Sequence, residues 1–293
     1  MILPRPSLLP TLVRELARRD HVARQPEPDV IMNDPAHVAA YAESGRADGI
    51  MAAANLFHSA RASLLVQDCN SVLDLGCGPG TQLVQIAELN PGVRFVGVDL
   101  ADNMLADARR YSAARRVRNV QWQRADICAL AQFADGSFDA VISTMTLHHL
   151  PSREHLDRCF AEIGRVLRPR GALYLADFGH LKTSRSIRYF AHMHRDSLPR
   201  EVCEDYERSL QAAFRVEDYR AASARLAFPT QVYATFLVPL MIIVETPDRM
   251  VLPGTLQTRL RDMRQRLHPR YRRELDELRL FFRLSGLPAD AFR

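Results

Sequence analysis

The segment at positions 74–81, Asp-Leu-Gly-Cys-Gly-Pro-Gly-Thr, has the residue types and the spacing of a ligand-binding loop. An apolar run at 71–73 predicts a buried strand before it, and residues 82–89 follow with helical spacing. Glycines let the backbone turn tightly and approach a ligand, and the start of a helix leaves N–H groups free to donate. The segment therefore predicts a nucleotide-binding corner. Its candidate binding residues are Asp74, Gly76, Cys77, Gly78 and Gly80.

The glycine spacing separates this loop from the usual dinucleotide-binding loop. A dinucleotide fingerprint reads G-x-G-x-x-G, whereas the glycines here occupy positions 76, 78 and 80, and Asp74 stands two residues before the first. This D-x-G-x-G-x-G pattern resembles motif I of the class I S-adenosylmethionine (SAM)-dependent methyltransferases. The resemblance implies SAM as the cofactor and S-adenosylhomocysteine (SAH) as the product, and the spacing disfavours a nicotinamide oxidoreductase.

A second predicted strand, residues 93–98, leads into Asp99, about twenty residues after the glycine loop. A carboxylate at that place can accept hydrogen bonds from both ribose hydroxyls of a nucleotide. A helix N-cap is the structural alternative for this aspartate. The resemblance also implies cofactor contacts for Leu100 and Met104, which stand where the next helix is expected to begin.

Two further predicted strands, at 120–127 and 138–144, follow in the order that the resemblance requires. In that family, an aspartate at the end of the third strand accepts a hydrogen bond from the adenine amino group. The segment after the fourth strand separates the methyl donor from the acceptor. The residues that the resemblance places at these two points are Asp126, Ile127, Thr144 and Met145.

His148 and His149 follow the fourth predicted strand, at the carboxyl edge where ligands bind in sheets of this type. A histidine there can take a proton near neutral pH, so both are candidate catalytic residues. Positioning of the acceptor supplies much of the rate of a methyl transfer, and a base is needed only when the acceptor is protonated. The structural alternative is that one histidine packs or orients the following helix.

The alternation of predicted strands and helices indicates an α/β protein. The resemblance implies a Rossmann-like methyltransferase sheet of seven strands, mostly parallel with an antiparallel last strand, and its final two strands are expected within 227–244. We expect an N-terminal helical cap at 1–68, a SAM-binding methyltransferase domain at 69–250 and a C-terminal helical extension at 251–293.

Residues 180–215 have helical spacing and no predicted strand, and the resemblance places a substrate lid at this point. The histidines and arginines of this lid suggest an anionic or carboxylate acceptor. On the N-terminal cap, Tyr41 is a candidate to close over the methionine end of the cofactor, with a packed core tyrosine as the alternative. The candidate substrate residues of the lid are His180, Arg188, His192 and His194.

Leucines at helical spacing within 255–285 predict an amphipathic helix that packs on its own domain or on a second copy of the chain. The arginines of the same stretch raise the alternative of an RNA-binding arm. Acidic side chains are interleaved with these arginines and aromatic residues are sparse, which favours packing. The terminal helices are therefore the candidates for a homodimer interface.

Composition narrows the remaining classes of function. The net charge is +5, but Lys182 is the only lysine, so the arginines reflect the GC-rich coding of a bacterial genome as much as a nucleic-acid surface.

Five dispersed cysteines without C-x-x-C spacing predict no metal and no disulfide, and indicate a reducing cytoplasm. Binding of arsenite by dispersed cysteines is the alternative left open. The longest apolar stretch, 232–244, is interrupted by Pro239 and predicts no membrane span.

The segment at 143–146 reads Ser-Thr-Met-Thr. Amino-methylating enzymes for DNA, some RNA and protein glutamine have N-P-P-Y or D-P-P-Y at this place. The sequence therefore predicts methyl transfer from SAM to a small-molecule acceptor. The alternatives are a tRNA or protein methyltransferase and a SAM-binding regulator without methyl transfer, and the acceptor atom stays open among oxygen, nitrogen, sulfur and carbon.

Overall fold

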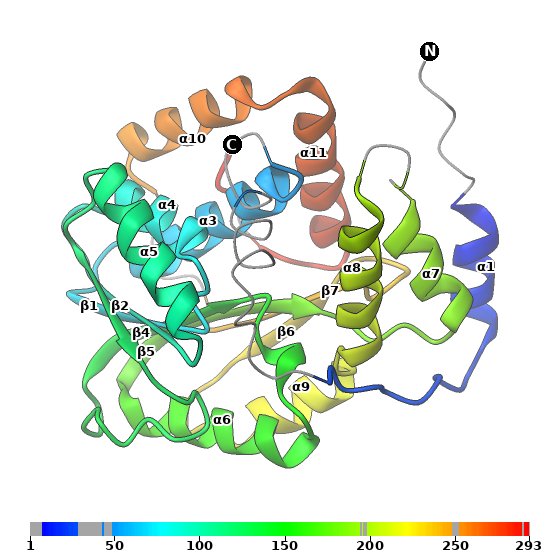
Figure 1. The fold of residues 1–293 in the computed structure, drawn as a ribbon, viewed down its shortest axis with the longest axis horizontal. Coiled ribbons are helices and arrows are strands. Elements are labelled where there is room, and N and C mark those ends of the chain that lie inside the picture. The colour runs from blue at the N-terminus through cyan, green and yellow to red at the C-terminus, as the bar shows by residue number, and fades with distance from the viewer. Residues whose placement is uncertain are drawn as a thin grey trace.

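The structure is a computed structural model, and it describes residues 8–28, 43, 49–193, 195, 198–247, 252–288 and 290–292. Two of the predicted site residues, Tyr41 and His194, lie outside the described residues. The described chain is built around one seven-stranded sheet with helices on both faces (Figure 1).

Five strands of the sheet run parallel to one another, and the last two strands along the chain pair antiparallel with each other. Its order is β3-β2-β1-β4-β5-β7-β6, and β7 runs antiparallel to both β5 and β6. This order confirms the predicted seven-stranded, mostly parallel sheet with an antiparallel last strand. The strands are β1 (Ser71–Leu75), β2 (Arg94–Asp99), β3 (Val120–Arg124), β4 (Phe138–Thr144), β5 (Leu167–Phe178), β6 (Gln231–Ala234) and β7 (Met241–Glu245).

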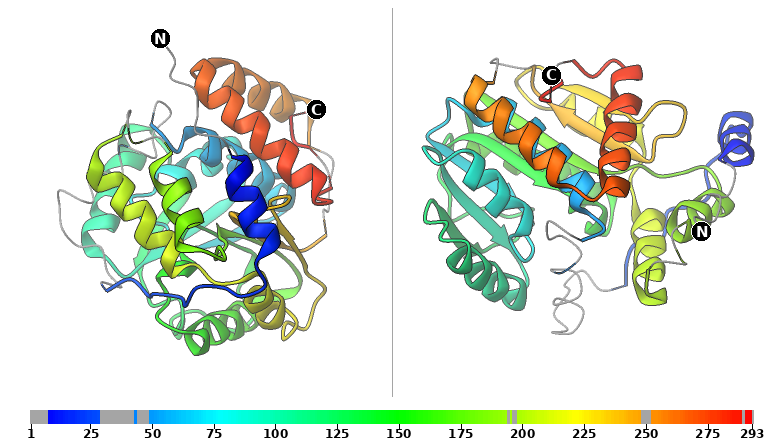
Figure 2. Two further views of the ribbon diagram at one scale, coloured as in Figure 1. Left: turned by 90° about the vertical axis from the view of Figure 1, so that its right-hand side faces the viewer. Right: turned by 90° about the horizontal axis from the view of Figure 1, so that it is seen from above.

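Helices α3, α4, α10 and α11 cover one face of the sheet, and α6 and α9 cover the other. Helices α1, α7 and α8 form a separate layer beyond the ends of the strands (Figures 1 and 2). Among the described residues, no helix is both long and apolar enough to cross a membrane. The helices are α1 (Leu9–Ala17), α3 (Ala52–Val66), α4 (Thr81–Leu89), α5 (Asp102–Ala114), the 3₁₀ helix η1 (Leu147–His149), α6 (Arg153–Val166), α7 (Ser184–His192), α8 (Arg200–Ala212), α9 (Val216–Ser223), α10 (Gly254–Arg266) and α11 (Pro269–Leu284).

The turn between β1 and α4 requires glycine for two separate reasons. Gly76 has a φ of +66°, and a Cβ there would lie 2.0 Å from Cγ2 of Thr146. Gly80 has a φ of +75° immediately before α4, and a Cβ there would lie 2.6 Å from the ring of Trp122. L-residues with side chains rarely adopt this left-handed backbone, so both glycines are needed for the loop to close against its neighbours.

The C-terminal extension folds as two helices that pack on the protein's own core. Leu256 and Leu260 of α10 and Leu275 and Phe282 of α11 belong to the same buried cluster as α3. The Phe282 ring stacks on Phe57 of α3 at a centroid distance of 5.3 Å. This packing confirms the reading of the leucine pattern as a packed amphipathic face.

A buried ion pair fastens α3 to the sheet. The Arg61 guanidinium on α3 donates to the Glu245 carboxylate on β7 at 2.5 Å, and both side chains are only 2% exposed. Beside this pair, the Tyr174 hydroxyl of β5 is hydrogen-bonded to Nδ1 of His58 at 2.6 Å. Removing one partner of a buried pair leaves the other charge uncompensated in a poorly solvated interior.

We therefore expect Arg61→Met to lower the free energy of unfolding by about 3–5 kcal/mol, because Glu245 would keep its buried charge without its partner. The double variant Arg61→Met/Glu245→Leu should recover most of that loss. Urea titration followed by circular dichroism measures both values. A single variant as stable as the parent would contradict this account of the pair.

Candidate active site

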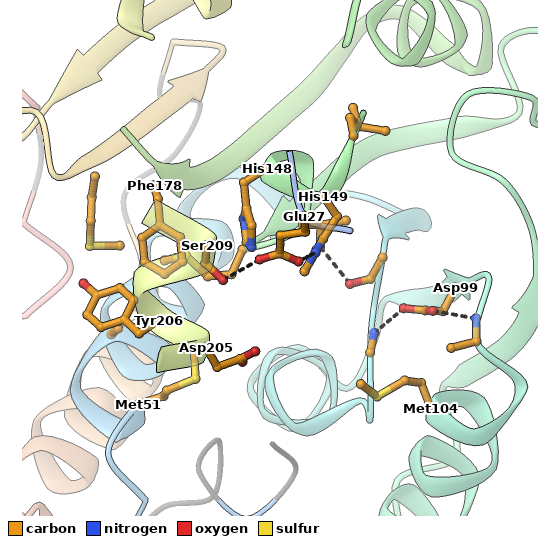
Figure 3. Close-up of a pocket in the computed structure, with 18 of the residues that line it drawn as sticks. Glu27, Met51, Asp99, Met104, His148, His149, Phe178, Asp205, Tyr206 and Ser209 are labelled. Atoms are coloured by element: carbon orange, nitrogen blue, oxygen red, sulfur yellow. Dashed lines mark hydrogen bonds and ion pairs between the residues drawn. The ribbon is translucent and has the colours of Figure 1, made fainter. Parts of the chain in front are cut away.

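A cavity of about 500 Å³ opens at the carboxyl ends of the parallel strands (Figure 3). Residues that follow β1, β2 and β3 line one half of it. The other half is lined by residues that follow β4 and β5, by α8 and by the segment before α3. Both predicted catalytic histidines and most of the predicted cofactor residues therefore share a single cavity.

Asp99 organises the half of the cavity nearest the glycine loop. One carboxylate oxygen accepts from the Gly78 N–H and the other from the Ala101 N–H, each at 2.9 Å. Burial raises the pKa of Asp99, and these backbone donors offset only part of that effect. The predicted cofactor residues that line this half are Gly76, Gly78, Asp99, Leu100 and Met104.

Asp126, Ile127 and Met145 line the cavity further along the sheet edge. The Asp126 carboxylate accepts from the Cys128 N–H at 2.8 Å, which fixes the turn after β3. Met145 has a φ of 53°, an uncommon backbone for a residue with a long side chain. Its left-handed backbone lies at the point where the chain leaves β4 and turns into η1.

Four of the predicted cofactor residues stand behind the cavity lining. The Thr144 hydroxyl donates to Oε1 of Gln82 at 2.7 Å, which joins β4 to α4. Burial, together with the nearby Asp99 charge, raises the pKa of Asp74 well above its usual value. These residues shape the loop and the strand ends. The four are Asp74, Cys77, Gly80 and Thr144.

The two predicted catalytic histidines differ in their surroundings, and His149 is the one joined to a carboxylate inside the cavity. Its Nδ1 lies 2.5 Å from Oε2 of Glu27, and the other oxygen of Glu27 accepts from the Ser209 hydroxyl at 2.9 Å. The His149 side chain is 31% exposed. Burial lowers the pKa of His149, but the hydrogen bond and charge of Glu27 outweigh it, so the pKa is raised. Burial opposes ionisation of Glu27, yet the contact with His149 lowers its pKa to about 2.

His148 is buried and belongs to a second pair. Its Nδ1 lies 2.7 Å from Oδ1 of Asp177 at the end of β5, and its backbone N–H donates to Oδ2 of Asp177 at 2.9 Å. The two side chains are 3% and 1% exposed. This pair anchors η1 to the sheet, as the structural alternative for one histidine anticipated, and it leaves His149 as the more accessible histidine.

Residues 18–28, which belong to the N-terminal cap, carry Glu27 into the cavity. Arg24 holds it there by donating to the backbone oxygens of His148, Leu150, Pro151 and Ala212 at 2.6–2.9 Å. We call residues 18–28 the N-terminal strap. The sequence offered no signal for Glu27, because it stands between two prolines in a stretch with no strand or helix pattern.

The three predicted lid residues that the structure describes, His180, Arg188 and His192, do not line the cavity. His180 is buried and its Nε2 lies 2.8 Å from the backbone oxygen of Val22, so it binds the N-terminal strap. His192 contacts Glu207 at 2.7 Å, and Arg188 approaches the same carboxylate at 3.9 Å while its side chain is 71% exposed. The expectation that these groups attract an anionic acceptor therefore has no support in their placement.

Glu27, His148 and His149 have ligand atoms within 4.8 Å of one another, a set that could hold a metal ion. The cysteine pattern, which predicted no metal, does not bear on this set. Both Nδ1 atoms already contact carboxylates, and a carboxylate so placed is the usual orienter of a histidine that moves a proton. The geometry therefore favours proton transfer over metal binding.

The sheet order, the glycine turn and the carboxylates at the ends of β2 and β3 are together typical of a class I SAM-dependent methyltransferase domain. Asp99 and Asp126 offer carboxylate acceptors at two points of the cavity edge, and this donor and acceptor chemistry fits a nucleoside-containing cofactor. Residues 72–171 match the family model described as a methyltransferase domain. The chain contains a domain of that family, whose cofactor is SAM.

Curated relatives agree with this assignment. The chain is 38% identical over 107 residues to a demethylmenaquinone methyltransferase of Thermus thermophilus, which covers 36% of this chain and 46% of that protein. It is 35% identical over 162 residues to a malonyl-[acyl-carrier protein] O-methyltransferase of Geobacter sulfurreducens, 54% of this chain and 55% of that protein. The chain thus spans about half the length of these relatives or less.

Solved structures support the fold. A SAM-dependent methyltransferase from Aquifex aeolicus superposes with a TM-score of 0.52 at 16% identity, covering 73% of this chain and 98% of that one. Phosphoethanolamine N-methyltransferase 2 of Haemonchus contortus superposes with a TM-score of 0.53 at 19% identity, covering 88% of this chain and 51% of that one. At these identities the likeness concerns the fold alone.

We expect Asp99→Asn to weaken SAH binding by about 10- to 100-fold, because an amide would replace the charged acceptor that we propose for the ribose hydroxyls. Isothermal titration calorimetry of the full chain measures this constant. Asp135→Asn, a change at an exposed carboxylate whose side chain is 81% exposed, is the matched control. Unchanged SAH affinity in Asp99→Asn would remove Asp99 from the cofactor site.

Proposed function

We propose that this protein transfers a methyl group from SAM to a hydroxyl group of a small molecule bound in the cavity, with His149 accepting the hydroxyl proton. The observation that carries the proposal is the Glu27–His149 pair, which faces the same cavity as the glycine loop and Asp99. When bound, SAM supplies an electrophilic methyl group on its sulfonium. The residues of the chain therefore need to hold the cofactor, orient the acceptor and take its proton.

The Glu27 carboxylate sets the protonation pattern of His149. An ionised carboxylate beside Nδ1 favours the tautomer whose proton is on Nδ1, which leaves Nε2 as the unprotonated atom. Glu27 is itself oriented by the Ser209 hydroxyl. A base oriented by a third group in this way is the general arrangement of an activated nucleophile. Nε2 of His149 is then the atom that takes the acceptor proton.

Positioning of the cofactor and the acceptor supplies the rest of the rate acceleration. Glycine-loop N–H groups, Asp99 and Asp126 would fix the cofactor, and the opposite wall of the cavity would fix the acceptor. Holding two reactants in line converts a bimolecular step into an effectively unimolecular one and contributes roughly 7–11 kcal/mol. This function needs no further catalytic group.

A small-molecule acceptor suits the shape of the site. A cavity of about 500 Å³ lies within the usual range for small-molecule sites. Relatives named for action on demethylmenaquinone and trans-aconitate agree with that class of acceptor. The cytoplasm is the compartment that we propose. Methyl transfer to tRNA or protein, and SAM binding without transfer, are the outcomes that the labelling experiment below would reveal.

We expect His149→Ala to lower the rate of methyl transfer by about 10²- to 10⁴-fold, the usual contribution of a general base. SAH affinity should stay within about twofold, because the catalytic and cofactor halves of the cavity are separate. The assay follows label from methyl-labelled SAM into the small-molecule fraction of an extract of the source cells. Added chelator should leave the rate unchanged, and a rate that depends on metal would contradict proton transfer by this pair.

The pH profile provides an independent test. His149 acts as a base only when neutral, and Glu27 raises its pKa, so the rate should fall as the pH drops through a value above the ordinary histidine pKa of about 6.5. Glu27→Gln removes the charge that raises this pKa. The acidic limb of the rate profile should therefore move to lower pH, with a lower plateau. A limb that does not move would show that this pair is not the titrating group.

A further inference from the structure

The acceptor half of the cavity is rich in carboxylates. Glu27 lies against His149 in this half, so the pair carries a net negative charge when His149 is neutral and Glu27 is ionised. Asp205 of α8 lines the same half. Asp205 forms an ion pair with Arg208 at 3.1 Å, and these side chains are 44% and 47% exposed. Water screens an ion pair that is so exposed.

Asp205 lies close to the reacting pair. It stands one helical turn before Ser209, so the two side chains share one face of α8. Ser209 donates to Glu27, and Figure 3 shows Asp205 and Ser209 on the same helix beside the cavity. The charge of Asp205 is among the causes that raise the pKa of His149. The Asp205 carboxylate is thus part of the electrostatic surroundings of the acceptor.

Aromatic rings form the wall next to these carboxylates. The rings of Phe178 and Tyr206 are 5.2 Å apart, and Phe178 is also 5.2 Å from the ring of His148. Phe178 and Tyr206 both line the cavity. The faces of such rings attract cations, so the wall and the carboxylates favour the same sign of charge.

Positive side chains are scarce in the described lining. Arg270 is the one arginine or lysine among the described residues that line the cavity, and its guanidinium is 3.0 Å from Glu274. His180, Arg188 and His192, which were predicted for the lid, are not part of this lining. A carboxylate or phosphate on the acceptor would meet Glu27 and Asp205, and in the described lining only Arg270 offers it an arginine or lysine side chain.

We propose that the acceptor carries a positively charged amino group, which Asp205 and the aromatic wall of Phe178 and Tyr206 bind while its hydroxyl reaches His149. The inference rests on the proposed function only in placing the acceptor in this cavity. It selects hydroxylated amines with an aromatic or apolar body and rejects acidic compounds of the same shape. Asp205 is the residue that determines this charge preference.

The test measures binding of three phenols that differ in one end group: tyramine, tyrosol and 4-hydroxyphenylacetate. Isothermal titration calorimetry uses the full chain saturated with SAH, so no turnover is required. Tyramine should bind at least about tenfold tighter than the carboxylate, with tyrosol between them, as expected for charges a few ångströms apart near a protein surface. Asp205→Asn should reduce the ratio to about twofold or less.

Two further variants test whether the charge preference comes from Asp205. Arg208→Ala removes the cation that competes for Asp205, so it should increase the preference for tyramine. Asp135→Asn, an exposed carboxylate paired with Arg165, should leave the preference unchanged.

Equal binding of the three phenols, no binding of any of them, preference for the carboxylate, or a ratio unaltered in Asp205→Asn would each overturn the inference. Methyl transfer is measured separately. Amine preference without any transfer would overturn the proposed function alone, and transfer without amine preference would overturn this inference alone.

Discussion

The arrangement of the candidate active site depends on the guanidinium group of Arg24. Its donors reach the backbone oxygens of His148, Leu150 and Pro151 at the end of η1, and that of Ala212 at the end of α8. The same group lies 3.9 Å from the centre of the Phe214 ring. Charge-assisted hydrogen bonds with this geometry are about twice as strong as neutral ones. One side chain thus fastens the N-terminal strap to two other parts of the chain.

This fastening matters because the catalytic pair is divided between distant segments. His149 belongs to η1, at the edge of the sheet, whereas Glu27 belongs to the N-terminal strap and Ser209 to α8. None of these segments could hold the three groups in place alone. Further hydrogen bonds, from the Val22 N–H to the Lys182 oxygen and from the Gln25 N–H to the Gln211 oxygen, fix the strap on both sides of Arg24. The reacting groups are therefore held by backbone atoms that are themselves paired.

The parts of the structure that the sequence predicted are those governed by short-range rules. The glycine turn, the strands around it and Asp99 follow from spacing within about thirty residues, and the seven-stranded order follows from the family resemblance. Glu27 was missed because it acquires its role through a contact with a residue 122 positions away, and Asp177 was missed because no sequence motif links it to His148. The candidate lid residues that the structure describes looked functional from their charge, but they pair with Glu207 or with the strap, whereas Tyr206 and Ser209 of the same segment line the cavity. Composition reveals charge, but only tertiary structure reveals which charges face a cavity.

The acidity of the cavity and the protonation of His149 are physically coupled. Glu27 and Asp205 raise the pKa of His149, which favours the protonated histidine that cannot accept a proton. A cationic group bound beside Asp205 acts in the opposite direction, since a like charge nearby disfavours the protonated imidazole. Occupation of the cavity by such an acceptor would therefore shift His149 towards its neutral form. The carboxylates that select the acceptor would in this way make the base available mainly when the acceptor is present.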